Sequence, residues 1–245
     1  HEQPDGRQPR AKGTHHVEVR KSTIARLESC LTEAVLASSY VEYYGLAEPP
    51  FSLTTNLRYL FMTPALREAM DGVLAGIKAR AGFMVITGES GMGKTLLCRA
   101  IVNELGPGVH VATVPDPRAD QDTIAAQVAE DLGLADVGTL EDVLKSLGAK
   151  GEQAVVVIDE AQLLGQSTFE ELWRLAILQV GETRLLQVVL IGSPELAEVL
   201  NRPALQALRK QVHSLFSLKP LTRSEVAEYL TFRLGLAREG ASREA

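Results

Sequence analysis

A glycine-rich segment, residues 88–95, has the residue types and the spacing that phosphate binding requires. It fits the pattern GxxxxGK[ST] in full and reads Gly88-Glu89-Ser90-Gly91-Met92-Gly93-Lys94-Thr95. The glycines permit the backbone dihedral angles that turn several N–H groups inward. Lys94 would bring a positive charge to the β- and γ-phosphates, and the Thr95 hydroxyl would face Mg²⁺. With Leu96, which follows, the segment is predicted to bind a nucleoside triphosphate.

Two carboxylates, Asp159 and Glu160, follow directly on the apolar run 154–158. An open α/β sheet binds ligands at the carboxyl ends of its strands, so a strand here would deliver both side chains to the ligand. Asp159 is predicted to hold the Mg²⁺ shell, directly or through water. Glu160 is predicted to orient and polarise the attacking water. The alternative, a strand that merely ends in a charged loop, is disfavoured beside a complete phosphate loop.

Five short, near-continuous apolar runs are predicted as the strands that position these groups. They span residues 83–87, 109–114, 154–158, 187–191 and 214–218. Helices are predicted between most of them, at residues 94–105, 121–132, 140–147, 167–180, 195–200 and 203–212. Near-continuous apolar strands separated by helices are typical of a parallel sheet that is covered on both faces. The predicted fold is therefore α/β with three layers.

Three further helical segments flank this region. Thr63 as N-cap and Pro64 at the first helical position predict a helix that ends at Gly82. Apolar residues at helical spacing predict an amphipathic helix over residues 22–44, followed by an extended connector, so residues 22–62 form one segment before the core. The last predicted helix spans residues 222–238.

Composition excludes several classes of protein. With 245 residues, 45% of them hydrophobic and 23% charged, the chain is long enough to bury a full core. No apolar stretch approaches the roughly 18 residues of a membrane helix, so no transmembrane segment is expected. Cys30 and Cys98 have no CxxC or Cys/His cluster around them, which favours a reducing compartment. Because the first residues also lack an apolar signal sequence, a cytoplasmic location is expected.

Positive charge is concentrated at the start of the chain. Residues 1–26 carry six Lys/Arg against three acidic residues, whereas the whole chain has a formal net charge of -6. Hydrophobic periodicity is absent before Ile24, so a flexible basic arm is expected over residues 1–21. The alternative is a contact with nucleic acid or with an acidic partner.

On these motifs the chain resembles the AAA+ ATPases and, among them, the general secretion pathway protein A (ExeA-like) family. The resemblance extends over about residues 43–236 and includes Gly45-Leu46, Pro50-Phe51, Gly82-Phe83, Asp159-Glu160-Ala161-Gln162, Gly192-Ser193-Pro194-Glu195-Leu196, Leu208-Arg209 and Pro220-Leu221-Thr222-Arg223. It implies a P-loop ATPase core over residues 63–219 with a five-stranded parallel sheet, and ATP with Mg²⁺ as its ligands. Residues 220–245 would begin a helical lid, which looks truncated.

The resemblance also implies two further site residues. Ser193, after the fourth strand, would be the sensor that contacts the γ-phosphate or the attacking water, where the family usually has Gln. As an alternative, Ser193 caps the next helix. Arg209 would be the arginine finger that reaches a neighbouring subunit's nucleotide. The family pattern has a second arginine where this chain has Gln211, so the resemblance leaves open which of the two positions carries the arginine finger. Lys210 could partly substitute for the missing arginine. The alternative is that these residues only form a solvated basic helix face.

For function, the resemblance implies a Mg²⁺-dependent ATPase that assembles into a homo-oligomer, a ring or a filament, with nucleotide at the subunit boundaries. It would act with a protein partner, as secretion-linked assembly ATPases do. The alternative is an ATP-dependent, DNA-binding regulator of transposition that selects target DNA and recruits a transposase. The basic arm favours duplex DNA as a partner, and the acidic total charge disfavours it. A nucleotide-gated switch with slow hydrolysis is a third reading, suggested by Ser193 and Gln211.

Overall fold

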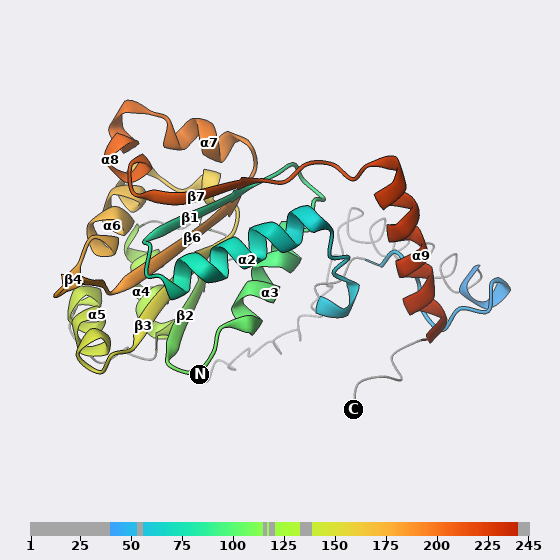
Figure 1. Ribbon diagram of the computed structural model, residues 1–245, viewed down its shortest axis with the longest axis horizontal. Helices are drawn as coiled ribbons and strands as arrows, with labels where there is room; N and C mark the ends of the chain where they lie inside the picture. Colours follow the sequence, from blue (N-terminus) through green and yellow to red (C-terminus); the bar gives the residue numbers. More distant parts are fainter. Residues whose placement is uncertain (1–39, 53–55, 115–116, 118–120, 133–138, 240–245) are drawn as a thin grey trace, which may run out of the picture. The chain divides into compact units, whose positions relative to one another are not determined.

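A five-stranded parallel sheet with the strand order β2-β3-β6-β1-β7 forms the centre of the fold (Figure 1). Its strands are β1 (Phe83–Thr87), β2 (Val109–Val114), β3 (Gln153–Ile158), β6 (Leu186–Gly192) and β7 (Val212–Ser217). Each neighbouring pair runs parallel. All five predicted strands are present, with ends that differ by at most two residues from the prediction. The predicted α/β fold with a five-stranded parallel sheet is confirmed.

The structure is a computed structural model that describes residues 40–52, 56–114, 117, 121–132 and 139–239. The chain divides into two compact units, His1–Ser52 with Leu234–Ala245 and Leu53–Arg233. The predicted basic arm and most of the helix predicted over residues 22–44 lie outside the described residues. Residues 40–43 are helical and a turn at residues 44–45 follows, in which Gly45 has a φ of +61°.

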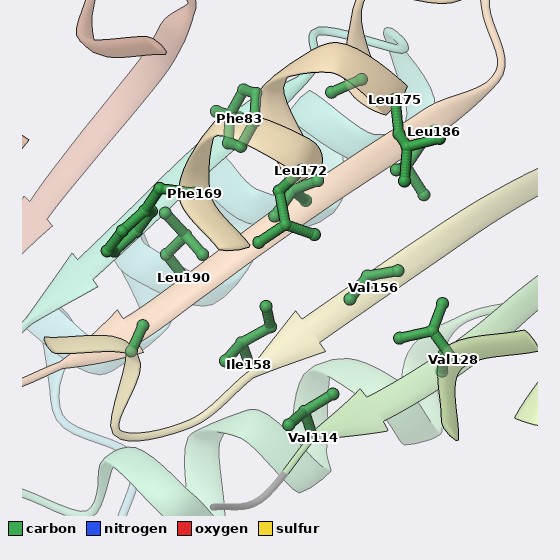
Figure 2. Packing of buried hydrophobic residues seen from close by; sticks show 14 of the residues in the cluster. Phe83, Val114, Val128, Val156, Ile158, Phe169, Leu172, Leu175, Leu186 and Leu190 are labelled. Atoms are coloured by element: carbon green, nitrogen blue, oxygen red, sulfur yellow. The ribbon is translucent and has the colours of Figure 1, made fainter. Parts of the chain in front are cut away.

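Helices cover both faces of the sheet and make the three predicted layers. On one face lie α2 (Pro64–Lys78) and α3 (Lys94–Glu104). On the other lie α4 (Gln121–Asp131), α5 (Leu140–Ala149), α6 (Gln166–Ala176), α7 (Glu195–Leu200) and α8 (Gln206–Arg209). Side chains of β3 alternate between the two cores, because Val156 and Ile158 face α4–α8 and Val155 and Val157 face α2 and α3. Figure 2 shows how leucine, valine and phenylalanine side chains fill the α4–α8 core.

The elements around the phosphate loop form for local reasons. Thr63 Oγ1 accepts a hydrogen bond from Leu66 N (3.2 Å) and Pro64 opens α2, as the sequence predicts. β1 lies between β6 and β7, and all five of its residues are buried. The loop that follows β1 therefore emerges from the interior of the sheet rather than from an edge strand.

Several predicted helices are longer than the observed ones, and α2, predicted to continue to Gly82, ends at Lys78. The helix predicted over residues 167–180 ends at Ala176, and the chain then forms a short antiparallel pair, β4 (Gln179–Val180) with β5 (Thr183–Arg184). Gly181, with φ +63°, permits the turn between them. The helix predicted over residues 203–212 is instead a 3-10 turn, η3 (Pro203–Leu205), followed by α8, because Val212 already begins β7.

The remaining described elements are η1 (Leu57–Tyr59), η2 (Ala161–Leu163) and α9 (Arg223–Glu239). In the smaller unit, Ala47 N donates a hydrogen bond to Ala237 O (2.7 Å). Among the residues that the structure describes, no helix combines the length and the apolar character needed to cross a bilayer.

Candidate functional site

The phosphate loop, Gly88–Thr95, joins β1 to α3 at the carboxyl edge of the sheet. Gly91 and Gly93 have φ values of +82° and +79°, which residues with side chains adopt at a cost. A Cβ added at either position would meet no atom within 4 Å, so backbone conformation rather than crowding within the chain requires glycine there. Gly88 N donates to Gly192 O (3.1 Å), which fixes the start of the loop against β6.

Lys94 lies across the inside of this loop. The residue is 6% exposed, and its Nζ donates a hydrogen bond to the Glu89 carbonyl oxygen (3.0 Å). Lys94 is also the first residue of α3, and Gly93, as its N-cap, offers no side chain to the first N–H groups of the helix. The ammonium group and the positive end of the helix therefore lie together, an arrangement that favours a bound anion.

Thr95 and Asp159, which the sequence predicts as Mg²⁺ ligands, lie in direct contact. Thr95 Oγ1 donates a hydrogen bond to Asp159 Oδ2 (2.7 Å), and Asp159 is 5% exposed. Mg²⁺ prefers such oxygen ligands and usually binds one or two carboxylates together with water and phosphate oxygens. The donor set at this point therefore fits Mg²⁺. Within the described residues, no group of three or more His, Cys, Asp or Glu side chains could hold a metal ion.

Glu160 follows Asp159 at the end of β3 and has an unusual backbone conformation. Its φ and ψ angles are 50° and 36°, the left-handed region, and its backbone N–H donates to Asp159 Oδ1 (2.9 Å). The Glu160 carboxylate accepts a hydrogen bond from Gln162 Nε2 (2.6 Å). Gln162 Oε1 accepts in turn from Ser193 N (3.0 Å). The sequence motif contains Gln162, but its pattern gave no indication of this connection.

Ser193 lies just after β6, where the sequence predicts it. Its hydroxyl donates to Glu195 Oε2 (2.8 Å). The cap position of α7 is occupied by Pro194, and no side chain there bonds to the helix N–H groups. The structure therefore does not show the alternative role of Ser193 as a helix cap.

Arg209 is the last residue of α8, and its side chain is exposed. It makes no hydrogen bond or ion pair with any residue that the structure describes. Gln211, at the position of the family's second arginine, accepts a hydrogen bond from Arg184 Nη2 (2.7 Å). Of these two positions, Arg209 alone has an exposed basic side chain that bonds to no described residue.

A cavity of about 230 Å³ adjoins the phosphate loop. Its lining includes Gly91, Met92, Gly93 and Leu96 from the loop side, and Tyr59, Phe61, Leu218, Tyr229 and Arg233. Arg233, only 6% exposed, stacks its guanidinium on the Tyr59 ring at 4.6 Å from the ring centre and donates to the Tyr229 hydroxyl (3.3 Å). No sequence pattern singled out these three residues, although Tyr229 and Arg233 share one face of a predicted helix.

A second cavity, of about 600 Å³, is lined in part by Thr95, Cys98, Gln127 and Asp159. Cys98 is 4% exposed, as the sequence predicts for a small buried side chain. Burial, and to a lesser extent the negative charge of Asp159, raises the pKa of its thiol to about 12. Cys98 is thus a neutral packing residue rather than a nucleophile.

Comparison with known proteins decides the family. A family profile described as an AAA domain matches residues 77–200, half of the chain. The chain belongs to the AAA+ family. The matched range contains the phosphate loop, Asp159, Glu160 and Ser193, whereas Arg209 lies beyond it.

Individual relatives agree with this assignment. General secretion pathway protein A of Aeromonas hydrophila is 35% identical over 207 residues, which are 81% of this chain but 38% of that protein. Among solved structures, Cdc6p from Pyrobaculum aerophilum matches with a TM-score of 0.57 at 15% identity, over 72% of this chain and 51% of the other. The ORC2 protein of Aeropyrum pernix, solved as ADPNP and ADP complexes, matches with a TM-score of 0.54 at 20% identity, over 69% and 50%. At these identities the two structures support the fold alone.

Proposed function

We propose that this chain binds ATP with Mg²⁺ at the phosphate loop and hydrolyses it. The observation that carries the proposal is the 2.7 Å hydrogen bond between Thr95 and Asp159. This bond holds Thr95, at the end of the phosphate loop, against Asp159, which directly follows β3. Glu160 is the residue after Asp159. Membership of the AAA+ family supports the same activity.

In this proposal, the backbone N–H groups of residues 88–96 bind the phosphates, and Lys94 compensates the charge of the β- and γ-phosphates. A Mg²⁺ ion held by Thr95 and Asp159 would neutralise charge on the phosphate oxygens. Glu160 orients a water molecule and accepts its proton while the water oxygen bonds to the γ-phosphorus and the bond to the leaving ADP oxygen breaks. The cavity of about 230 Å³ beside Gly91 and Gly93, with its aromatic and apolar lining, is where the nucleoside would bind.

We further propose a homo-oligomer, a ring or a filament, in which Arg209 reaches the nucleotide of a neighbouring subunit and Ser193 senses the γ-phosphate. The exposed and unengaged side chain of Arg209 supports the first role. The position of Ser193, held through Gln162 beside Glu160, supports the second. An arginine supplied in this way stabilises the negative charge that develops in the transition state.

The cellular role is proposed from the secretion relative, with a protein partner and a cytoplasmic location. This chain spans 38% of that relative, so the proposal concerns the ATPase part alone. The alternative of a DNA-binding regulator of transposition rests on the basic residues 1–26, which have six Lys/Arg against three acidic residues.

The activity is tested by measuring phosphate release from ATP with Mg²⁺, together with the affinity for a fluorescent ATP analogue. Glu160→Gln is expected to keep analogue binding, to lower turnover by about a hundredfold or more, and to accumulate an ATP-bound assembly. Glu182→Gln, at an exposed position in the turn between β4 and β5, is the matched control. Turnover of Glu160→Gln at the parent rate would remove Glu160 from the chemistry.

Light scattering with and without ATP and Mg²⁺ tests the assembly, and it is repeated with duplex DNA at low and moderate salt. Assembly on ATP alone supports the secretion-like ATPase. Assembly that requires DNA and weakens steeply with salt supports the transposition alternative. A monomer under all of these conditions contradicts the proposed oligomer.

A further inference from the structure

Gln162 connects the Glu160 carboxylate to the neighbouring strand. Its Nε2 donates to Glu160 Oε2 (2.6 Å), and its Oε1 accepts from the backbone N–H of Ser193 (3.0 Å). Glu160 follows β3 and Ser193 follows β6, and these two strands pair in the sheet. One side-chain amide therefore spans the carboxyl ends of two adjacent strands.

The chemistry of its two partners fixes the orientation of the amide. A backbone N–H can only donate and an ionised carboxylate can only accept, so Oε1 must face Ser193 and Nε2 must face Glu160. Only a side chain with a donor and an acceptor at this reach makes both bonds. Asparagine is one methylene shorter, and glutamate would place a second negative charge beside Glu160.

Gly192 provides the space that this amide occupies. A Cβ added at Gly192 would overlap Gln162 Oε1 and would also approach Gln162 N to 3.4 Å. A side chain at Gly192 would therefore displace the Gln162 amide. The position of the amide thus depends on two residues that lie far apart in the sequence.

The direction of the Glu160 side chain depends on Gln162. The backbone N–H of Glu160 is fixed by Asp159 Oδ1 (2.9 Å), but this bond does not hold the carboxylate. Across the described parts of the chain, Gln162 is the one group that donates a hydrogen bond to the Glu160 carboxylate. The bond holds Oε2 and leaves Oε1 available to a water molecule.

We propose that Gln162 is a positioning residue that aims the Glu160 carboxylate and couples it to the β6–α7 turn. The inference rests on the proposed ATPase function. Because the other end of the amide is bound to Ser193 N, a displacement of that turn moves the amide, and with it the carboxylate. Contact of Ser193 with the γ-phosphate would thereby change how well Glu160 orients the attacking water.

The first test replaces Gln162 by Met, which has a similar volume and cannot make either bond. Because this variant loses a hydrogen bond to the charged Glu160 carboxylate, we expect its kcat to be about 10- to 100-fold lower than that of the parent. The affinity for the fluorescent ATP analogue should stay within about twofold, because Gln162 lies outside the phosphate loop. Gln166→Met is the matched control, since Gln166 donates the same kind of bond to Glu170 (2.8 Å) at an exposed position of α6.

A double-mutant cycle separates positioning from a general structural effect. If Gln162 acts through Glu160, Gln162→Met causes no further loss of kcat in the Glu160→Ala background. A readout independent of activity is hydrogen exchange without nucleotide, in which the Ser193 amide should exchange about tenfold faster in Gln162→Met. If Gln162→Met does not fold, Gly192→Ala displaces the same amide from the other side and is expected to lower kcat in the same way.

The outcomes distinguish this inference from the proposed function. Suppose the parent hydrolyses ATP, but the fall in kcat of the double mutant equals the product of the falls caused by Gln162→Met and Glu160→Ala alone. The inference is then overturned and the ATPase function stands. The same holds if Gln162→Met or Gly192→Ala folds and turns over at the parent rate. If the parent binds the analogue without hydrolysing ATP under any assembly condition, the proposed function and this inference both fail.

Discussion

Thr95 Oγ1 lies 2.7 Å from Asp159 Oδ2 and donates a hydrogen bond to it. The two residues belong to α3 and to the end of β3, and β3 is separated from β1 by β6 in the sheet. Parallel strands end at the same edge, so the acidic end of β3 comes to the loop that follows β1. The contact places a hydroxyl and a carboxylate side by side, as a Mg²⁺ ion would require them.

Thr95→Ala is expected to raise the Mg²⁺ concentration needed for half-maximal ATP hydrolysis by about tenfold, because one proposed oxygen ligand is lost. Thr95→Ser keeps the hydroxyl and is expected to stay close to the parent. A Mg²⁺ titration of phosphate release measures both. An unchanged Mg²⁺ dependence in Thr95→Ala would contradict the assignment of Thr95 as a ligand.

Lys94→Ala is expected to weaken binding of the ATP analogue by about 10- to 100-fold, because a charge-assisted hydrogen bond to phosphate is lost. Lys94 is buried in the phosphate loop, where its Nζ donates to the Glu89 carbonyl oxygen. Lys78→Ala, at the exposed end of α2, removes a comparable charge away from the loop and serves as the control. Titration by fluorescence anisotropy distinguishes the two, and equal affinities would exclude Lys94 from the site.

Some parts of this site could be predicted from the sequence because they depend on local patterns. The phosphate loop is contiguous, and Asp159 follows a strand whose place is set by general rules of parallel sheets. Gln162 could not be predicted in the same way, because one of its partners is a backbone N–H on another strand and no side-chain pattern records it. Apolar residues such as Ile177 and Val180 continue the helical spacing, and this concealed the pair β4–β5.

Arg209→Ala is expected to spare ATP binding and to lower hydrolysis about a thousandfold in the assembled state alone, because the proposed finger would act on a neighbouring subunit. Arg202→Ala removes another exposed arginine near α8 and is the control. Adding Glu160→Gln subunits, which keep Arg209, should restore activity to Arg209→Ala subunits in mixtures. If Arg209→Ala lowers hydrolysis equally in dilute monomer, or if mixing does not restore hydrolysis, Arg209 does not act between subunits.

Stability should depend on pH through an ion-pair cluster that joins α5 to α6. Arg174 pairs with Glu141 (2.9 Å) and Glu171 (2.8 Å), and Lys145 pairs with Glu141 (2.7 Å). Hydrogen bonds from Lys145 and Arg174 lower the pKa of Glu141, and a hydrogen bond from Arg174 lowers the pKa of Glu171. Their stabilisation is present above the ordinary pKa of 4.5 and is lost as the pH falls through the lowered values.

Arg174→Met should therefore flatten the pH dependence of the free energy of unfolding between about pH 5 and pH 3. Arg202→Met, which changes an exposed arginine without a described partner, should leave that dependence unchanged. Urea unfolding at several pH values measures both variants. A parallel downward shift of the whole Arg174→Met curve would show lost packing rather than a lost ion pair.

Cys98 is expected to resist alkylation while the protein is folded. Its thiol pKa is raised to about 12, so about one molecule in ten thousand carries the thiolate at pH 8. Iodoacetamide labelling, followed by mass spectrometry of the Cys98 peptide, should show modification only after unfolding in urea. Burial is the main cause of the raised pKa and the charge of Asp159 a smaller one, so Asp159→Asn should leave Cys98 protected. Rapid labelling of native Asp159→Asn would instead make the charge of Asp159 the dominant cause.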